Sequence, residues 1–316
     1  MTDSAFDPVD AALVARFSDV ATFLRARRMD PCAEIDIGLV GVPFDIGLNY
    51  RGGPREAPSA VRQASRIIRK VHPTSGTEPY RLCNVADIGD APVNPLNKEE
   101  SIAGIEDYFR TLKKLGIRPI AIGGDHTIPT PILRGLAHDR PVGIVQIDSH
   151  SDTLDTLMGT KVNHATFMRR GLEEGLIDPK RVVQIGLRGS RFSANDISFG
   201  YDAGFTIITF DEYEEMGRSA VIEKMRATIG TGPTYLTIDI DGLDPAFCPG
   251  TPVPEIGGLT PRDVQVIVRA LKDCTLVGAD ISEVAPCYDP TNITSVTAAN
   301  LMFEILCVMA AQTKIS

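Results

Sequence analysis

The sequence contains no tryptophan, few aromatic residues and no pair of cysteines at the CxxC spacing of zinc knuckles and redox motifs. It also has no excess of positive charge, since 32 Lys and Arg stand against 41 Asp and Glu. A net charge of −9 disfavours nucleic acid as a partner, because phosphate binding needs clustered Lys and Arg. The acidic start lacks the basic and apolar regions of a signal peptide, and no apolar run reaches the length of a membrane span. These absences predict a cytoplasmic protein with no nucleic-acid or membrane partner.

Apolar, strand-like runs alternate with helical segments over most of the 316 residues. This alternation predicts an α/β protein with a mainly parallel sheet and helices on both faces. No internal repeat, low-complexity tract or linker divides the chain, so we expect a single domain over residues 1–316. Residues 1–33 are expected to form an N-terminal helical extension, because residues 10–28 have helical periodicity. The apolar run 300–312 contains Glu304 and is expected to be a buried helix.

Three ionisable residues, Asp148, His150 and Asp152, alternate directly after the apolar run 142–147. A strand, or a chain that stays extended just past its end, directs residues i, i+2 and i+4 to the same side. Two carboxylates and an imidazole at a strand end suit a metal ion better than a hydrophobic core. The alternative is a polar loop whose residues happen to alternate.

Two further strand ends carry residues of the metal-binding type. Asp239 and Asp241 lie at the end of an apolar run, and His126 follows two glycines after the strand-like run 118–122. The structural alternatives are a solvated strand end for the two aspartates and a helix N-terminus capped by Asp125 for the histidine. Because the carboxyl ends of parallel strands meet at one edge of a sheet, these segments are expected to converge in space.

These segments resemble the ureohydrolases, the family of arginase, agmatinase and the guanidino-acid hydrolases. The resemblance is carried by GGDH at 123–126, IDSHSD at 147–152 and TIDIDGLDPAFCPG at 237–250, and it extends from about residue 41 to the C-terminal helix. It is strongest to the guanidinopropionase, guanidinobutyrase and agmatinase branch. It implies a three-layer αβα sandwich around an eight-stranded, mainly parallel sheet. It also implies an enzyme that hydrolyses a C–N bond of a guanidino compound to give urea and an amine.

The resemblance further implies two divalent metal ions bridged by a water molecule. Matched position by position, the implied ligands are His126, Asp148, His150, Asp152, Asp239 and Asp241. Four carboxylates and two imidazoles suit Mn²⁺, and Ni²⁺ is the alternative because it accepts the same donors and in general binds them more tightly. Asp152 is also the implied acceptor of a proton from the bridging water.

Two residues outside these motifs have implied catalytic roles. Glu283 matches the family glutamate that binds the guanidinium group through paired hydrogen bonds, although an ordinary surface acid is the alternative. His164 matches the family histidine that shuttles a proton to the leaving amine. The remaining histidines, His72 and His138, match no motif and are expected at the surface.

The sequence departs from the family pattern at positions that bear on the substrate. Leu154 stands where members that bind amino acids have asparagine, and Val253 stands where the usual loop has threonine. Both changes make the expected pocket less polar, whereas Ser149 in place of alanine is a tolerated variation. We therefore expect a small N-alkylguanidine, such as dimethylguanidine, as substrate. The expected substrate-binding residues are Leu154, Val253, Asn49 and Glu283.

Other substrates and other classes of protein stay open. A guanidino acid would need a partner for its carboxylate, and the candidates are Asn49, Arg51, Arg188 and Arg191. Agmatine would need an acid for its distal amine, and the candidates are Asp155 and Glu173. The rival classes are an inactive ureohydrolase-like subunit, a deacetylase- or phosphatase-like metallohydrolase and a metal-free binding module. The resemblance also implies a homo-oligomer, either a trimer or a hexamer.

Overall fold

The computed structural model describes residues 5–193 and 195–313, and its described strands form one sheet in which every pairing is parallel. The nine strands lie in the order β1-β3-β2-β4-β9-β8-β5-β6-β7. They are β1 (Arg27–Arg28), β2 (Ile37–Gly41), β3 (Val85–Asp90), β4 (Arg118–Ile122), β5 (Val142–Ile147), β6 (Ile177–Leu187), β7 (Thr206–Thr209), β8 (Pro233–Asp239) and β9 (Thr275–Ser282). The predicted parallel sheet is therefore confirmed, and the two-residue strand β1 adds a ninth strand at one edge.

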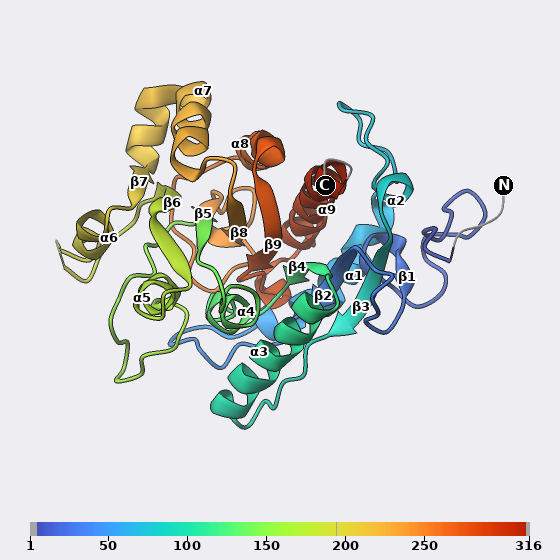
Figure 1. Ribbon diagram of the computed structural model, residues 1–316, viewed down its shortest axis with the longest axis horizontal. Helices are drawn as coiled ribbons and strands as arrows, with labels where there is room; N and C mark the ends of the chain where they lie inside the picture. Colours follow the sequence, from blue (N-terminus) through green and yellow to red (C-terminus); the bar gives the residue numbers. More distant parts are fainter. Residues whose placement is uncertain (1–4, 194, 314–316) are drawn as a thin grey trace.

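Helices cover both faces of the sheet, so the molecule has three layers (Figure 1). One face carries α3 (Lys98–Lys114), α4 (Pro129–Leu136) and α5 (Phe167–Glu173). The other carries α7 (Phe210–Ile229), α8 (Pro261–Arg269) and α9 (Ile293–Thr313), with α1 (Ala57–Ala64) and α2 (Pro79–Leu82) packed against α9. The short helix α6 (Ser198–Ala203) precedes β7 at the far edge (Figure 1). This arrangement confirms the predicted αβα sandwich.

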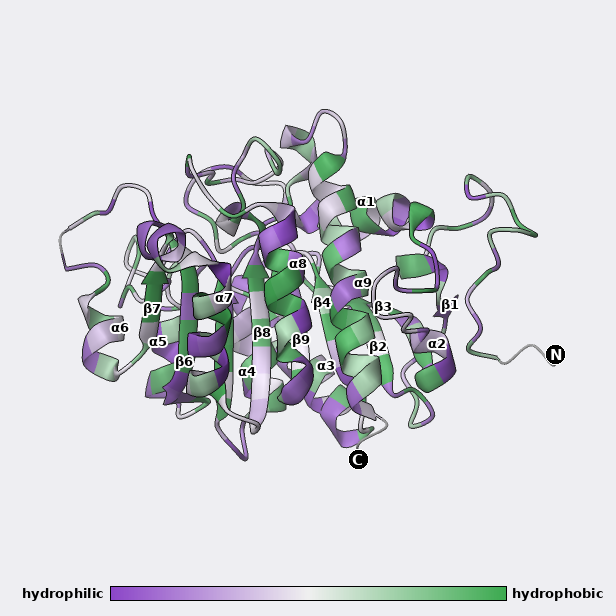
Figure 2. Ribbon diagram, turned by 90° about the horizontal axis from the view of Figure 1, so that it is seen from above, coloured by the Kyte–Doolittle hydropathy of each residue, from purple (hydrophilic) through white to green (hydrophobic). Residues whose placement is uncertain are grey.

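The central strands are apolar along their whole length because both of their faces are buried. In β5, Val145 and Ile147 pack into the core beneath α7, α8 and α9, while Val142 and Ile144 pack into the core beneath α3, α4 and α5. Figure 2 shows the apolar strands enclosed between helices whose outer faces are more hydrophilic. Burial on both faces explains why these strands appear in the sequence as continuous apolar runs instead of alternating ones.

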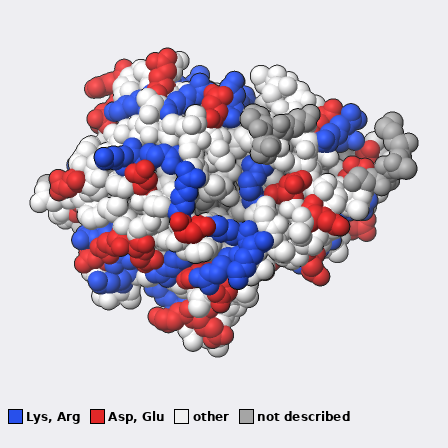
Figure 3. Space-filling view, in the orientation of Figure 1, with Lys and Arg blue, Asp and Glu red and all other residues white. Residues whose placement is uncertain are grey.

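Basic and acidic side chains lie close to one another on the surface. On the face shown in Figure 3, Lys and Arg side chains alternate with Asp and Glu side chains. Ion pairs elsewhere in the structure include Arg134 with Glu174 (2.7 Å) and Arg226 with Asp273 (3.2 Å). Exposed pairs of this kind contribute at most about 1 kcal/mol each.

The expected N-terminal helix is wrong over the residues that the structure describes, while residues 1–4 lie outside them. Between residues 5 and 33 the chain forms turns, the 3₁₀ turn η1 (Phe23–Arg25) and β1. The side chain of Arg25 donates hydrogen bonds to the carbonyls of Val9 and Val14. It therefore holds the backbone of this segment, in which the hydrogen bonds of a helix were expected. The apolar positions of the predicted helix remain mostly exposed, namely Leu13 (85%), Phe17 (91%) and Val20 (90%). An apolar helix face stabilises a helix only when it packs against another part of the protein, and these side chains do not.

The C-terminal helix α9 is long and apolar enough to cross a membrane, which the sequence analysis did not expect. However, 83% of its apolar window is buried inside the fold, as predicted for a core helix. Its buried Glu304 accepts hydrogen bonds from Arg269 (2.8 Å) and pairs with Nε2 of His72 (2.9 Å). The expectation that His72 lies at the surface is therefore wrong, since it is 3% exposed and stacks on Phe303. His138 is exposed, as expected.

We predict that Arg269→Met lowers the free energy of unfolding by about 3 kcal/mol, because it leaves the buried Glu304 carboxylate without its bidentate partner. Denaturant titration followed by circular dichroism measures the change. Arg262→Met is the matched control, since Arg262 is exposed and bonds only Gln265 in the described chain. Equal stability of the two variants would contradict the structural role of this network.

Candidate functional site

The predicted site residues lie at the carboxyl ends of four neighbouring central strands, in the spatial order β4, β9, β8 and β5. His126 follows β4, Glu283 follows β9, and Asp239 ends β8. Asp148, His150 and Asp152 follow β5. Figure 2 shows that long connecting loops gather along this edge of the sheet. Segments more than 100 residues apart in the sequence are thus brought together, as the alternation of strands and helices predicts.

The first group of potential ligands surrounds His126. Its Nδ1 lies 2.7 Å from Oδ2 of Asp152, 3.0 Å from Oδ2 of Asp148 and 3.4 Å from Oδ2 of Asp239. All four side chains are at most 5% exposed. Three carboxylates therefore converge on one imidazole nitrogen in a buried space.

A second group surrounds His150. Its Nδ1 lies 3.1 Å from Oδ2 of Asp241 and 3.6 Å from Oδ1 of Asp148. In each group, ligand atoms from three residues lie within 4.8 Å of one another, and Asp148 belongs to both groups. The two oxygens of Asp148 thus face different histidines, which is the arrangement of a carboxylate that bridges two cations.

The chemistry of these residues fits divalent metal ions. Nδ1 of His126 and Oδ2 of Asp152 are buried and close together, yet neither makes a hydrogen bond. Burial, together with Asp148, raises the pKa of Asp152 to about 7. Burial, together with Asp241, raises the pKa of Asp239 well above its usual value. Crowded buried carboxylates need protons or cations to neutralise them, and hard oxygens with two imidazoles favour a divalent cation.

A layer of polar residues inside the sheet orients His126. Its Nε2 lies 2.8 Å from Oγ1 of Thr237, which donates to Oδ1 of Asp280 (3.0 Å). The hydroxyl of Tyr235 donates to Oδ2 of the same aspartate (2.7 Å). This chain fixes the ring so that Nδ1 faces the carboxylates. No motif in the sequence singled out these three residues, although a polar side chain inside an apolar strand was a signal for each of them.

A similar layer orients Asp148. Gln146 donates from Nε2 to Oδ2 of Asp148 (2.6 Å), and Gln184 donates to Oε1 of Gln146 (2.6 Å). Both glutamines are fully buried. Asp125 is buried as well and accepts from the backbone N–H groups of Gly47 and Thr127 (both 2.8 Å), which gives it the structural role considered for it from the sequence.

The backbone is strained at two of the predicted catalytic residues. Asp152 has φ of +53° and Glu283 has φ of +60°, a left-handed conformation that costs a non-glycine residue about 1–3 kcal/mol. Hydrogen bonds hold both turns, from the N–H of Met168 to Asp152 and from the N–H of Glu283 to Gly124. Such strain is typical of functional sites, where the surrounding structure supports it.

Glu283 is buried (3% exposed) and is not the surface acid that the sequence left open. Its Oε1 accepts a hydrogen bond from the backbone N–H of His126 (2.8 Å), whereas its Oε2 is buried without a hydrogen-bond partner. Burial, together with Asp125, raises the pKa of Glu283 well above its usual value. A buried carboxylate with an unused oxygen is poised to bind a cationic group.

His164 lies in the loop after β5, half-buried, with Nε2 3.1 Å from Oδ1 of Asn49. Burial and the neighbouring histidines His150 and His126 lower its pKa to about 4, so its imidazole is neutral at pH 7. The same loop is closed by a hydrogen bond from the N–H of Leu154 to the carbonyl of Ala165 (3.1 Å).

Most of the charged residues considered for a substrate tail are engaged elsewhere. Arg188 donates to several backbone carbonyls, including those of Asp241 and Glu255 (both 2.8 Å). Arg51 donates to the carbonyls of Thr251 and Pro252 (both 2.8 Å). The acids considered for agmatine, Asp155 and Glu173, both pair with Arg169 and Arg170. Arg191 is exposed.

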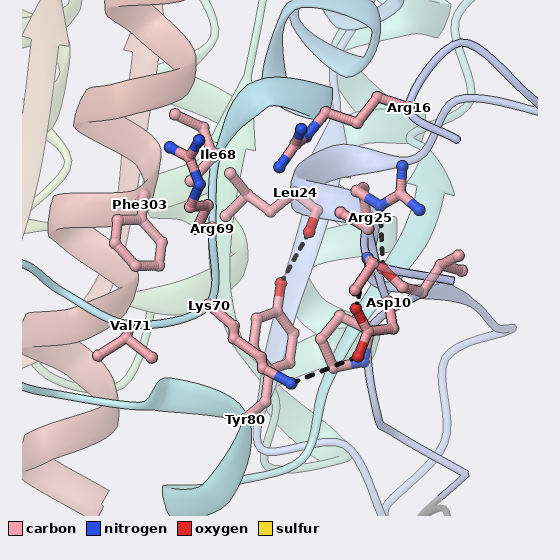
Figure 4. A pocket seen from close by; sticks show the side chains of 14 residues that line it. Asp10, Arg16, Leu24, Arg25, Ile68, Arg69, Lys70, Val71, Tyr80 and Phe303 are labelled. Carbon is pink, nitrogen blue, oxygen red and sulfur yellow. Dashed lines mark hydrogen bonds and ion pairs between the residues drawn. The ribbon is translucent and has the colours of Figure 1, made fainter. Parts of the chain in front are cut away.

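A separate cavity of about 440 Å³ lies between the N-terminal segment and α9 (Figure 4). Lys70 pairs with Asp10 across it (3.8 Å), and the hydroxyl of Tyr80 donates to the carbonyl of Leu24 (3.3 Å). None of the predicted site residues lines this cavity. The cluster at the strand ends is therefore the candidate functional site.

Comparison with known proteins places the chain in a family. The model of the Arginase family matches residues 35–308. Guanidinopropionase of Pseudomonas aeruginosa is 44% identical over 311 residues, and guanidinobutyrase of the same species is 40% identical over 313 residues; each alignment covers 98% of both chains. The structure of proclavaminate amidino hydrolase from Streptomyces clavuligerus aligns with a TM-score of 0.91 at 34% identity, covering 94% of this chain and 99% of that one. The chain belongs to the arginase family. Within that family it is a hydrolase that acts on C–N bonds of guanidino compounds.

We predict that Asp148→Asn abolishes tight binding of divalent metal, because Asp148 contributes to both groups of potential ligands. Metal content after dialysis, measured by atomic emission, reports the loss. Asp202→Asn is the matched control, since Asp202 is exposed and carries the same charge. A variant that retains as much metal as the control would show that Asp148 is not a ligand.

Proposed function

We propose that the chain is a binuclear-metal amidinohydrolase that cleaves a small N-alkylguanidine, such as dimethylguanidine, into urea and an amine. The observation that carries the binuclear assignment is that Asp148 faces His126 with one oxygen and His150 with the other. The six ligands are those implied by the sequence, namely His126, Asp148, His150, Asp152, Asp239 and Asp241. Mn²⁺ is the proposed metal, and Ni²⁺ is the alternative that the same donors accept.

Each proposed catalytic residue has a defined task. Two divalent cations held by the six proposed ligands would lower the pKa of a water molecule and would stabilise negative charge on its oxygen. Asp152 would accept a proton from this water molecule while the oxygen of the water bonds to the guanidinium carbon. Glu283 orients the guanidinium through its unused Oε2. His164 relays a proton to the leaving amine as the C–N bond breaks, and Asn49 holds its ring.

The pocket residues support an apolar substrate tail. Leu154 and Val253 offer no hydrogen bond at positions where family members have asparagine and threonine. The guanidinium groups of Arg51 and Arg188 already donate to backbone carbonyls, which leaves fewer of their N–H groups for a substrate carboxylate. A short alkyl group is the substrate tail that would leave no polar group unpaired beside these two apolar side chains.

A guanidino acid is the second candidate substrate class. It is favoured by the relative named guanidinopropionase, which is 44% identical over nearly the whole of both chains. In that case Asn49 or the exposed Arg191 would hold the carboxylate. Agmatine is disfavoured by the ion pairs of Asp155 and Glu173 with arginines.

Urea release by the purified protein, stripped of metal and reloaded separately with Mn²⁺ and Ni²⁺, tests both candidates. The substrates are N,N-dimethylguanidine, guanidine, guanidinopropionate, guanidinobutyrate, agmatine and arginine. We expect the highest kcat/KM with dimethylguanidine. A preference for either guanidino acid would replace this substrate with the second candidate, and absence of urea in every case would overturn the proposed function.

We predict that the double variant Leu154→Asn/Val253→Thr shifts the ratio of kcat/KM towards guanidinopropionate by about tenfold, because it restores two polar groups that an apolar tail leaves unpaired. Steady-state urea release with both substrates measures the ratio. Leu96→Asn is the control, since Leu96 is 94% exposed. An unchanged ratio would mean that neither position contacts the substrate tail.

We also predict that Glu283→Gln lowers kcat/KM by about 100-fold while metal content stays unchanged, because the amide keeps the shape but loses the charge that binds the guanidinium. Kinetics and metal analysis on the same preparation separate the two effects. Glu99→Gln on α3 is the exposed control. Loss of metal together with activity would point to a role in the metal centre instead.

A further inference from the structure

The two ring nitrogens of His150 face different surroundings. Nδ1 points to the inner carboxylates, 3.1 Å from Oδ2 of Asp241. Nε2 points the other way and lies 3.8 Å from Oε1 of Glu255, in the loop that follows β8. The sequence analysis assigned no role to Glu255. Its side chain is 23% exposed, and that of His150 is 32% exposed, so both lie at the outer rim of the cluster.

Two contacts fix the position of Glu255, one to its main-chain carbonyl and one to its carboxyl group. One guanidinium nitrogen of Arg188 donates to the carbonyls of Glu255 and Asp241 (both 2.8 Å). The loop that carries Glu255 is therefore tied to the backbone of a proposed metal ligand. The carboxyl group rests against Gly189, where a Cβ atom would lie only 2.2 Å from its carbon. Gly189 also has φ of +77°, so the position accepts no larger residue without strain.

We propose that Glu255 is a positioning residue that accepts a hydrogen bond from Nε2–H of His150 and thereby presents Nδ1 to the second metal position. This role rests on the proposed function, because it requires His150 to be a metal ligand. The separation of 3.8 Å is longer than a hydrogen bond, and a small rotation of either side chain shortens it to one. A carboxylate behind a histidine ligand fixes its tautomer and strengthens its donor nitrogen.

The two proposed metal positions then differ in the group that lies next to Nε2 of their histidine. Behind His126 stands the neutral hydroxyl of Thr237, fully buried at 2.8 Å from Nε2. Behind His150 stands a carboxylate at the solvent edge. The position served by His126 is thus held by the interior of the sheet, whereas the position served by His150 depends on Glu255 and on the Arg188 contacts that place it. We therefore expect the second position to be the more exchangeable one.

Titration of the metal-free protein with Mn²⁺, followed by calorimetry, tests the proposal. The unaltered protein is expected to bind two ions, and Glu255→Gln is expected to weaken only the second ion, by about 10- to 100-fold. Glu255→Ala, which removes the acceptor altogether, is expected to weaken it at least as much. Glu214→Gln on α7 is the control with the same loss of charge at an exposed position. Circular dichroism of each metal-free variant verifies that it folds.

The outcomes separate the role of Glu255 from the function of the site. Unchanged affinity for both ions in Glu255→Gln and Glu255→Ala, or equal weakening of both ions, would overturn the proposed role. In the ¹⁵N spectrum of the metal-free protein, the Nε2–H tautomer of His150 is expected to become less populated in Glu255→Ala than in the control. Failure of the unaltered protein to bind any Mn²⁺ or Ni²⁺ would instead overturn the proposed function, and the role of Glu255 with it.

Discussion

Buried negative charge at one edge of the sheet is the constraint on which the rest of the structure depends. Asp148, Asp152, Asp239, Asp241 and Glu283 are each at most 5% exposed, and two histidines are the bases among them. Ionised carboxylates at such density repel one another and lose their hydration, which destabilises the fold unless cations compensate. The stability of this edge is therefore linked to whatever cations it binds.

The strand order makes this concentration of charge possible. Because β4, β9, β8 and β5 are neighbours, ligands from distant parts of the sequence need only short loops to converge. Strands β8, β9 and β5 carry Thr237, Asp280 and Gln146, and the next strand, β6, carries Gln184. These side chains lie inside the sheet and orient the potential ligands from below. The cluster of potential ligands is therefore buried at its base and more exposed at its rim, where His150 lies. The left-handed backbone at Asp152 and Glu283 is tolerated because backbone hydrogen bonds with Met168 and Gly124 hold these two turns.

Sequence reasoning located the strand ends and their ligand-type residues, because apolar runs and period-two polar residues are local signals. It predicted a helix over residues 10–28, where the structure has turns, η1 and β1. It also gave wrong predictions where the structure of a residue depends on a contact with a residue far away in the sequence. His72 is buried by Glu304, 232 residues away, and the N-terminal periodicity at Phe17 has no partner surface in the described residues. No local pattern carries information of that kind.

The arginines show why residue type alone does not define a substrate. Arg51 and Arg188 stand in loops beside the cluster and, in the sequence, resemble anchors for a carboxylate. In the structure their donors bind backbone carbonyls and join the loops that carry Asn49, Val253 and Glu255. A guanidinium group used in this way sets the shape of a pocket instead of its charge. Under the proposed function, the substrate tail meets the side chains that these loops present, so their apolar residues and not the arginines select the guanidino compound.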